Sequence, residues 1–180
     1  INNNIEVKPL EGAWEIYFRG GWGAPEKVVF PKLQSWTESE NMGVKYFSGI
    51  ARYEKSFVYN INSNALEHSK IYLDLGDLSH VAEVWLNDNP LGITWAKPYR
   101  FDVTSILKAG ANKLVIKIAN TWNNRLVGDA LTQEKFTNTN ISSTVVRNGF
   151  FIRAPWAEAP LIESGLFGPV TLTTIKPVFK

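Results

Sequence analysis

The stretch from residue 71 to residue 119 constrains the fold more than any other part of this chain, because its apolar side chains recur at every second position. In the segment 71–75, the three residues Ile71, Leu73 and Leu75 fall on one face, and a Gly-Asp pair ends the run. The same alternation returns in three later segments, at 82–86, 99–103 and 113–119. A period of two is typical of a strand with one buried face, whereas a helix repeats about every 3.6 residues. The stretch therefore predicts an antiparallel sheet layer that faces water on one side.

Turn-forming residues separate these segments. Residues 87–90 read Asn-Asp-Asn-Pro, and Asn and Asp tolerate the dihedral angles of tight turns. Pro90 also has no amide hydrogen to donate to a neighbouring strand. We therefore expect a hairpin at this point, with residues 91–95 returning antiparallel to the segment before the turn. A second turn is expected at residues 108–112, which read Lys-Ala-Gly-Ala-Asn.

Short segments of the same kind occur outside this stretch and predict further strands, at 14–18, 28–30, 46–58 and 170–175. The glycine-rich segment 20–25 is expected to be a simple turn, because no Lys-Ser, no Lys-Thr and no helix follows it, as a phosphate-binding loop requires. The segments 60–69 and 132–143 are expected to be polar loops, and no convincing helix is found. Eight or more short strands with Gly, Pro and Asn turns predict an all-β fold, a two-sheet β-sandwich of the jelly-roll kind.

Length and composition favour one domain. A chain of 180 residues with 44% hydrophobic residues can bury one proper core. We expect a single β-sandwich domain over residues 10–180, and a linker or N-terminal extension over the mostly polar residues 1–9. The start of the chain does not resemble a signal peptide, and no run of about eighteen apolar residues predicts a membrane span. The chain is therefore expected to be a mature or excised piece of a longer protein.

Charge and cysteine content argue against several classes of function. The formal net charge is +2 and the nineteen basic residues are scattered, so neither nucleic acid nor an anionic membrane is an expected partner. The absence of cysteine removes disulfides, thiolate nucleophiles and cysteine-ligated metals. Seven Trp, six Tyr and ten Phe are a heavy aromatic load, which can serve core packing or ligand platforms.

No catalytic or metal-binding residue can be selected from the sequence. Glycosidic cleavage needs two carboxyl groups placed across a bond, and spacing does not single out such a pair. Aspartates beside predicted strand ends are more typical of turn hydrogen bonding, namely Asp74, Asp77, Asp102 and Asp129. The two histidines, His68 and His80, lie in polar turns without ligand-type neighbours, which argues against a zinc site or a catalytic triad. We expect no cofactor, and no dense acidic loop indicates a structural calcium ion, although such sandwiches can hold one.

Several motifs along the chain resemble one known family. They are GAWE at 12–15, YFSGIARY at 46–53, DLG at 74–76, AEVWLN at 82–87, LG at 91–92, DVT at 102–104, GANKL at 110–114 and SGLFGPV at 164–170. Together they resemble the sugar-binding jelly-roll domain of glycoside hydrolase family 2, over nearly everything from Leu10 to Ile175. The segment WNNRLVGD at 122–129 is similar to a more restricted version, the accessory domain of large bacterial alpha-L-rhamnosidase-type and beta-glycosidase-type enzymes.

The resemblance implies a galactose-binding-like β-sandwich that is not itself catalytic. The implied partners are carbohydrate and the catalytic domain of the same polypeptide, and the implied substrates of the whole enzyme are plant-type or host glycans. A bacterial enzyme of this kind is expected in the periplasm or outside the cell. The chain departs from the family pattern at 148–163, which keeps only Trp156, Glu158 and Glu163 of a stretch that is rich in Trp, His and acidic residues in relatives.

One constellation is enriched in groups that bind sugars: Trp122, Asn123, Asn124, Arg125 and Asp129. An indole face can stack on a pyranose, amides and a guanidinium can bond vicinal hydroxyls, and the aspartate can hold the arginine in place. The alternative is structural, with an ion pair of arginine and aspartate that fixes a loop and an indole that plugs the core. The same two interpretations stay open for Trp95 and Trp36, and the sequence does not decide whether Trp85 packs or is exposed.

Three functions are therefore open. The first is a non-catalytic carbohydrate-binding module of a glycoside hydrolase, which predicts an exposed aromatic side chain flanked by polar groups. The second is a scaffold domain that docks on the catalytic domain and binds no free sugar, which predicts a broad exposed apolar patch. The third is a small free-standing glycosidase, which predicts two carboxyl groups that converge in a cleft with shifted pKa values.

Overall fold

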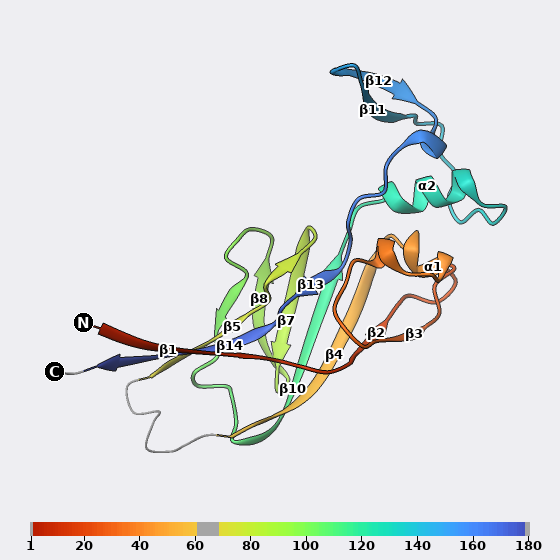
Figure 1. Ribbon diagram of the computed structural model, residues 1–180. Coiled ribbons are helices and arrows are strands. Elements are labelled where there is room, and N and C mark those ends of the chain that lie inside the picture. The colour runs from red at the N-terminus through yellow and green to blue at the C-terminus, as the bar shows by residue number, and fades with distance from the viewer. Residues whose placement is uncertain (1, 61–68, 179–180) are drawn as a thin grey trace.

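A computed structural model describes residues 2–60 and 69–178 and shows two antiparallel sheets packed against each other (Figure 1). The four-stranded sheet has the order β1 (Asn2–Pro9), β14 (Thr171–Val178), β5 (Lys70–Asp74) and β9 (Arg100–Asp102). The six-stranded sheet has the order β3 (Lys27–Phe30), β2 (Trp14–Tyr17), β4 (Ile50–Tyr59), β10 (Gly110–Ala119), β7 (Val81–Leu86) and β8 (Asn89–Thr94). The predicted all-β sandwich is confirmed.

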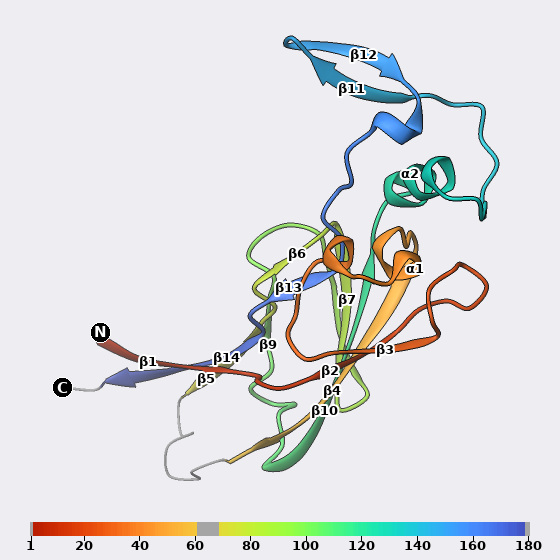
Figure 2. The same ribbon diagram turned by 45° about the vertical axis from the view of Figure 1, so that its right-hand side comes forward.

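Smaller elements complete the described part of the chain. Two pairs of short strands are β6 (Asp77–Leu78) with β13 (Leu166–Gly168), and β11 (Ser143–Arg147) with β12 (Phe150–Ala154). The helical elements are α1 (Met42–Lys45), α2 (Asn123–Leu131) and two 3-10 turns, η1 (Trp36–Glu38) and η3 (Trp156–Glu158). The helix α2 and the β11–β12 hairpin lie beyond one end of the sandwich (Figure 2).

The period-two pattern produces the core between the two sheets. In β10 the side chains of Leu114, Ile116 and Ile118 are buried, and they lie opposite Leu86, Val84 and Ala82 of β7. Directly opposed residues of antiparallel strands point to the same face, so these six side chains form one continuous apolar surface. The buried residues Ile71, Leu73 and Leu172 of the other sheet belong to the same core. The prediction of a half-buried sheet layer is therefore correct.

Trp36 belongs to this core and is fully buried. Its indole Nε1 donates a hydrogen bond of 2.6 Å to the hydroxyl of Tyr53, which also accepts one of 3.1 Å from the amide of Leu166. Burial raises the pKa of Tyr53, because the phenolate would be poorly solvated there. Gly165 has a φ of +107°, and a Cβ atom at this position would lie 2.6 Å from the Trp36 Nε1. The glycine of the SGLFGPV motif is therefore required by close packing, and Trp36 cannot serve as a surface platform.

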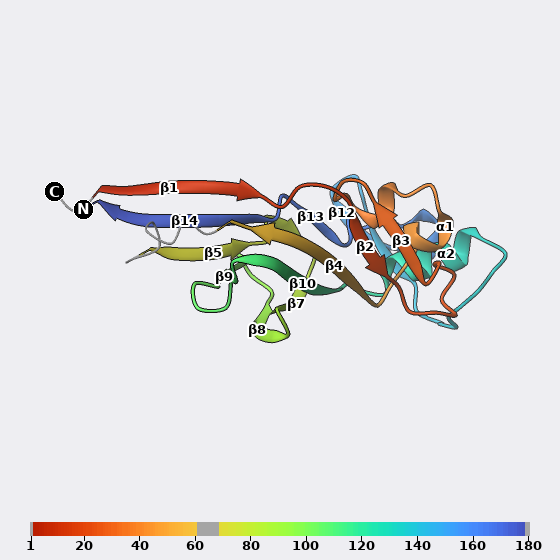
Figure 3. The same cartoon turned by 90° about the horizontal axis from the view of Figure 1, so that it is seen from below.

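The expectation of a linker or extension at residues 1–9 needs correction. Strand β1 pairs antiparallel with β14 along its whole length, and the two strands run side by side in Figure 3. The side chains of Ile5 and Val7 are exposed, so the strand has no buried apolar face for a pattern analysis to detect. Backbone pairing with β14 holds this edge strand instead. Most of the predicted polar loop at 60–69, including His68, lies outside the described residues.

The carboxyl group of Asp102 is expected to titrate near pH 2, because three donors stabilise its charged form. Its pKa is lowered to about 2 by the hydroxyl of Thr104 at 2.6 Å, then by the amide of Thr104 at 3.0 Å and by Lys70 Nζ at 3.0 Å. A folded-state pKa below the unfolded value of about 3.9 means that the contribution to stability is present above about pH 4 and is lost between about pH 4 and pH 2. Carboxyl carbon chemical shifts measured against pH give this pKa directly. In Thr104→Val it should rise, and an unchanged value would contradict this assignment.

Candidate functional site

The expectation of no convincing helix is wrong at Asn123–Leu131, which form helix α2. Helix α2 follows directly on β10 and lies beside α1 at one end of the sandwich (Figure 1). Gly128 lies inside the helix, and a Cβ atom there would come within 2.5 Å of both Tyr46 and the Arg125 guanidinium. The close contact therefore requires glycine at position 128, although glycine inside a helix is less favourable than alanine by about 1 kcal/mol. With nine residues, α2 is too short to show a clear 3.6-residue period.

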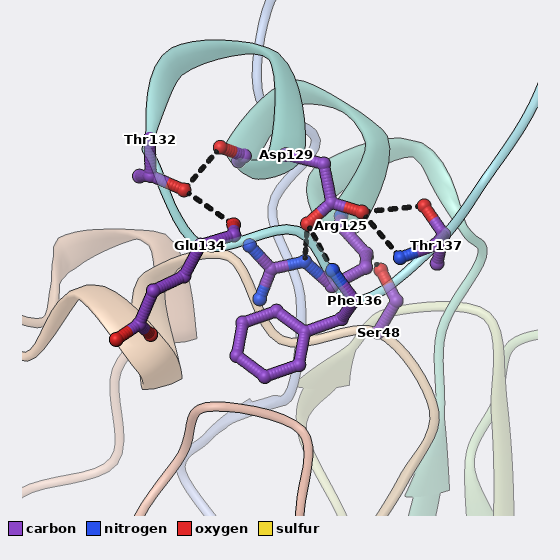
Figure 4. Close-up of polar contacts among 8 residues, drawn as sticks. Ser48, Arg125, Asp129, Thr132, Glu134, Phe136 and Thr137 are labelled. Atoms are coloured by element: carbon purple, nitrogen blue, oxygen red, sulfur yellow. Dashed lines mark hydrogen bonds and ion pairs between the residues drawn. The ribbon is translucent and has the colours of Figure 1, made fainter.

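Arg125 and Asp129 form the ion pair that the structural alternative predicts. Both side chains are buried, and the Nε atom of Arg125 lies 2.9 Å from Oδ1 of Asp129, although its N–H does not point at the oxygen well enough for a hydrogen bond. The carboxylate also accepts hydrogen bonds from the amides of Phe136 at 3.2 Å and Thr137 at 2.8 Å (Figure 4). The Thr137 hydroxyl adds a third at 2.5 Å. Asp129 thus fastens the following segment, residues 132–141, to the helix.

The two asparagines fasten the other side of α2. The buried Asn124 donates to the carbonyl of Ile162 at 2.7 Å and accepts from the amide of the same residue at 2.8 Å. Asn123 donates to the carbonyl of Pro160 at 3.0 Å. The amide groups of both residues therefore have partners within the chain, and Asn124 is too buried to reach a bound sugar in this structure.

Trp122 differs from its neighbours on the helix. Its side chain is 52% exposed, and its ring lies against the ring of Trp22, with centroids 5.3 Å apart and planes inclined by 47°. It is therefore not a core plug. It borders a groove of about 440 Å³ that is lined by Trp122, Leu126, Thr137, Asn138, Thr139, Ile141 and Trp156.

The groove combines apolar and polar groups. The indole Nε1 of Trp156 donates a hydrogen bond of 2.7 Å to the carbonyl of Ile141, which leaves the indole carbons as the apolar wall. The Thr137 hydroxyl donates to Asp129, so toward a ligand it can only accept. Asn138 and Thr139 are exposed at the border and add an amide and a second hydroxyl. Aromatic faces beside amide and hydroxyl groups can bind the apolar face and the hydroxyls of a sugar.

The structure does not bring Trp95 into this groove. Trp95 follows β8 and is 70% exposed. The register pairs Thr94 with Ala82 of β7 and Ala82 with Ile118 of β10. Trp95 therefore lies at the same end of the six-stranded sheet as the start of α2, but two strands away from β10. It remains a separate exposed aromatic side chain.

Sequence reasoning missed two residues of this region, Trp22 and Trp156. Trp22 lies in the glycine-rich segment that was expected to be a simple turn. Trp156 reaches the groove because the β11–β12 hairpin folds the chain back between Ile141 and Trp156. A detectable signal for this hairpin is the pair Asn148-Gly149, whose φ angles of +51° and +80° are those of the two-residue turns that favour Asn-Gly.

The described residues contain no group of three or more His, Asp or Glu side chains placed to hold a metal ion. The expected turn role of one aspartate is visible, since Asp74 accepts a hydrogen bond of 2.9 Å from the amide of Gly76. Trp85 lies under the ammonium group of Lys117, which is 4.4 Å from its ring centroid. No helix in residues 2–60 and 69–178 is long and apolar enough to cross a membrane.

Comparisons with known proteins agree with this architecture. The model of the family described as glycosyl hydrolase 2 galactose-binding domain-like matches residues 40–153. A rhamnosidase from Novosphingobium sp. PP1Y is 34% identical with a TM-score of 0.79, over 97% of this chain and 15% of its own. A curated protein of Formosa agariphila, named "Putative beta-glucuronidase", is 37% identical over 92% of this chain and 15% of its own length.

A beta-glucuronidase from Ruminococcus gnavus shares the fold, with a TM-score of 0.62 and 21% identity over 96% of this chain and 29% of its own. The chain thus spans only 15% of the rhamnosidase and of the curated relative. The family match covers more than half of the chain and includes most of the motifs that suggested the resemblance, with those at 12–15 and 164–170 outside the matched residues. This chain belongs to the glycosyl hydrolase 2 galactose-binding domain-like family.

Proposed function

We propose that this chain is an accessory domain of a larger glycoside hydrolase and binds carbohydrate in the groove between Trp122 and Trp156. The observation that carries the proposal is the half-exposed indole of Trp122 at the border of a groove that also offers an amide and hydroxyl groups. The names of the relatives and the small share of their length that the chain covers support the accessory role. Cleavage of the glycan belongs to another part of the whole enzyme.

The relatives also suggest which sugars to test. One relative is a rhamnosidase and another carries the name of a beta-glucuronidase. We propose plant-type or host glycans as the substrates of the whole enzyme. We therefore propose rhamnose, galactose, glucuronic acid and short plant-type oligosaccharides as first ligands. A bacterial enzyme for such polymers would act in the periplasm or outside the cell.

Nuclear magnetic resonance of the tryptophan indole groups can locate the site, because the chain has seven tryptophans and each gives its own indole N–H signal. During titration with the proposed sugars, the signals of Trp122 and Trp156 should shift together, since both line the groove. The signals of the buried Trp14 and Trp36 should stay in place and serve as internal controls. Shifts of the Trp95 signal alone would place the site elsewhere, and no shift with any of these sugars would contradict carbohydrate binding.

A second candidate function is docking on the rest of the polypeptide, and the β11–β12 hairpin favours it. One face of the hairpin packs through Val145 and Ala154 on a small second core. On the opposite face, Val146 and Phe151 form a cross-strand pair that is 61% and 81% exposed. Apolar side chains this exposed often mark an interaction surface. The two functions are compatible, because the groove and the outer face of the hairpin are different surfaces.

A further inference from the structure

A second cavity lies on the other side of the segment that Asp129 fastens to α2. It has a volume of about 250 Å³ and is lined by Gly23, Met42, Gly43, Tyr46, Arg125, Thr132, Gln133, Glu134 and Phe136. Adjacent residues of the fastened segment face the two cavities, since Phe136 lines this one and Thr137 lines the groove. The two cavities are therefore neighbours that share a wall, and each has its own set of polar groups.

The guanidinium group of Arg125 is the unusual feature of this cavity. The side chain is 2% exposed, and its Nε atom faces Asp129. Its central carbon lies over the Phe136 ring, 4.7 Å from the ring centroid, and this contact helps to fix the position of the guanidinium group. Neither of the two Nη groups donates a hydrogen bond to any residue in the described part of the chain. In Figure 4 both turn away from Asp129, to the side on which the Glu134 side chain lies.

The donors on the Nη side of the Arg125 guanidinium have no acceptor among the described residues. The fold needs only the Nε side of Arg125, because the ion pair with Asp129 and the contact with Phe136 already fix the side chain. The Nη groups carry four N–H donors in one plane, and they are open to the cavity, since Nε is the only Arg125 nitrogen that is fully buried without a hydrogen bond. Because Arg125 lines the cavity, a ligand in the cavity can supply the missing acceptors.

The charges around the cavity favour a neutral ligand over an anion. Asp129 balances the charge of Arg125, and Glu134 adds a further negative charge at the border. A carboxylate or phosphate would therefore be repelled by Glu134. A hydroxyl group can instead accept from an Nη group and donate to the Glu134 carboxylate or to the Gln133 amide oxygen. Two neighbouring hydroxyls on a ring match the two Nη groups of the planar fork.

We propose that this cavity is a second binding site, which takes a vicinal diol of a neutral sugar between the Arg125 Nη groups and the Glu134 carboxylate. The proposal rests on the proposed function only for the class of ligand, a carbohydrate. The two sites are otherwise independent, because no residue that lines the groove also lines this cavity.

The test follows the two sites separately in one titration with galactose or rhamnose. Signals of the Arg125 Nε–H group and of the Gly23 and Gly43 amides report on the cavity, and the indole signals of Trp122 and Trp156 report on the groove. We expect the cavity signals to shift in the wild type and also in Trp122→Ala. A result with groove shifts and no cavity shifts overturns this inference alone, and the reverse result overturns only the binding proposed for the groove.

A pair of matched variants tests the role of Glu134. Its side chain is exposed, so Glu134→Ala should leave the fold intact and weaken neutral-sugar binding in the cavity by about ten-fold, as expected for loss of one hydrogen bond to a charged group. Glu163→Ala, which removes an exposed acid that lines neither cavity, should bind like the wild type. Glucuronate should bind more weakly than galactose. Tighter binding of glucuronate, with a further gain in Glu134→Ala, would show an anion site and contradict the diol assignment.

Discussion

Replacement of Asp129 by alanine should destabilise the domain by about 3–5 kcal/mol, the usual cost of removing one partner of a buried ion pair. The change leaves the charge of Arg125 buried without its counter-ion. It also removes the acceptor of the Phe136 amide and of both donors of Thr137, so the wall between the two cavities loses its attachment to α2. The free energy of unfolding, measured with a chemical denaturant, should show the loss directly.

The matched control is Glu83→Ala, which breaks a surface ion pair. Glu83 and Lys117 are 3.6 Å apart and both are partly exposed, so this change should alter the free energy of unfolding by less than about 1 kcal/mol. A similar small effect for Asp129→Ala would mean that the buried pair does not hold the helix and segment 132–141 together.

Replacement of Trp36 by alanine should cost a comparable amount, about 3–5 kcal/mol, because it empties a fully buried site of the core. The rings of Phe18 and Phe47 lie edge-on to the indole, at centroid distances of 5.6 and 5.5 Å, and would lose these contacts. The Tyr53 hydroxyl would also lose its donor at 2.6 Å. Thermal unfolding should show a large decrease in the melting temperature or a failure to fold.

Trp95→Ala is the matched control, since it removes the same side chain from a site that is 70% exposed. The free energy of unfolding should change by less than about 0.5 kcal/mol. Equal losses for the two variants would contradict the placement of Trp36 in the core. The comparison also decides experimentally between two tryptophans that the sequence left equivalent.

The sandwich could be predicted because burial and periodicity coincide in its central strands. Leu114, Ile116 and Ile118 alternate with residues that do not face the core, so the pattern alone identifies the buried face. In β1 the apolar residues give no sign of burial, because Ile5 and Val7 are exposed. This strand is held by backbone pairing with β14. A pattern of side chains carries little information about such an edge strand.

The candidate site was predicted only in part, for a different physical reason. Trp122, the N-cap residue of α2, lies close in sequence to Arg125 and Asp129 within the helix, and these residue types suit either a sugar site or a structural ion pair. Which of them is exposed depends on segments distant in sequence, such as the carbonyl of Ile162 that binds Asn124. The contribution of Trp156 depends on the hairpin that places it there, and its Asn-Gly turn was the one local signal available.

The central claim is that Trp122 contributes to binding while its buried neighbours on α2 contribute to stability. The most direct test is Trp122→Ala, measured by thermal unfolding and by the shift of the Trp156 indole signal during titration with rhamnose, galactose and short plant-type oligosaccharides. Because Trp122 is half exposed, the melting temperature should stay close to that of the wild type, while the sugar-dependent shift of Trp156 should disappear. A loss of several kcal/mol of stability, or an unchanged Trp156 shift, would contradict the claim.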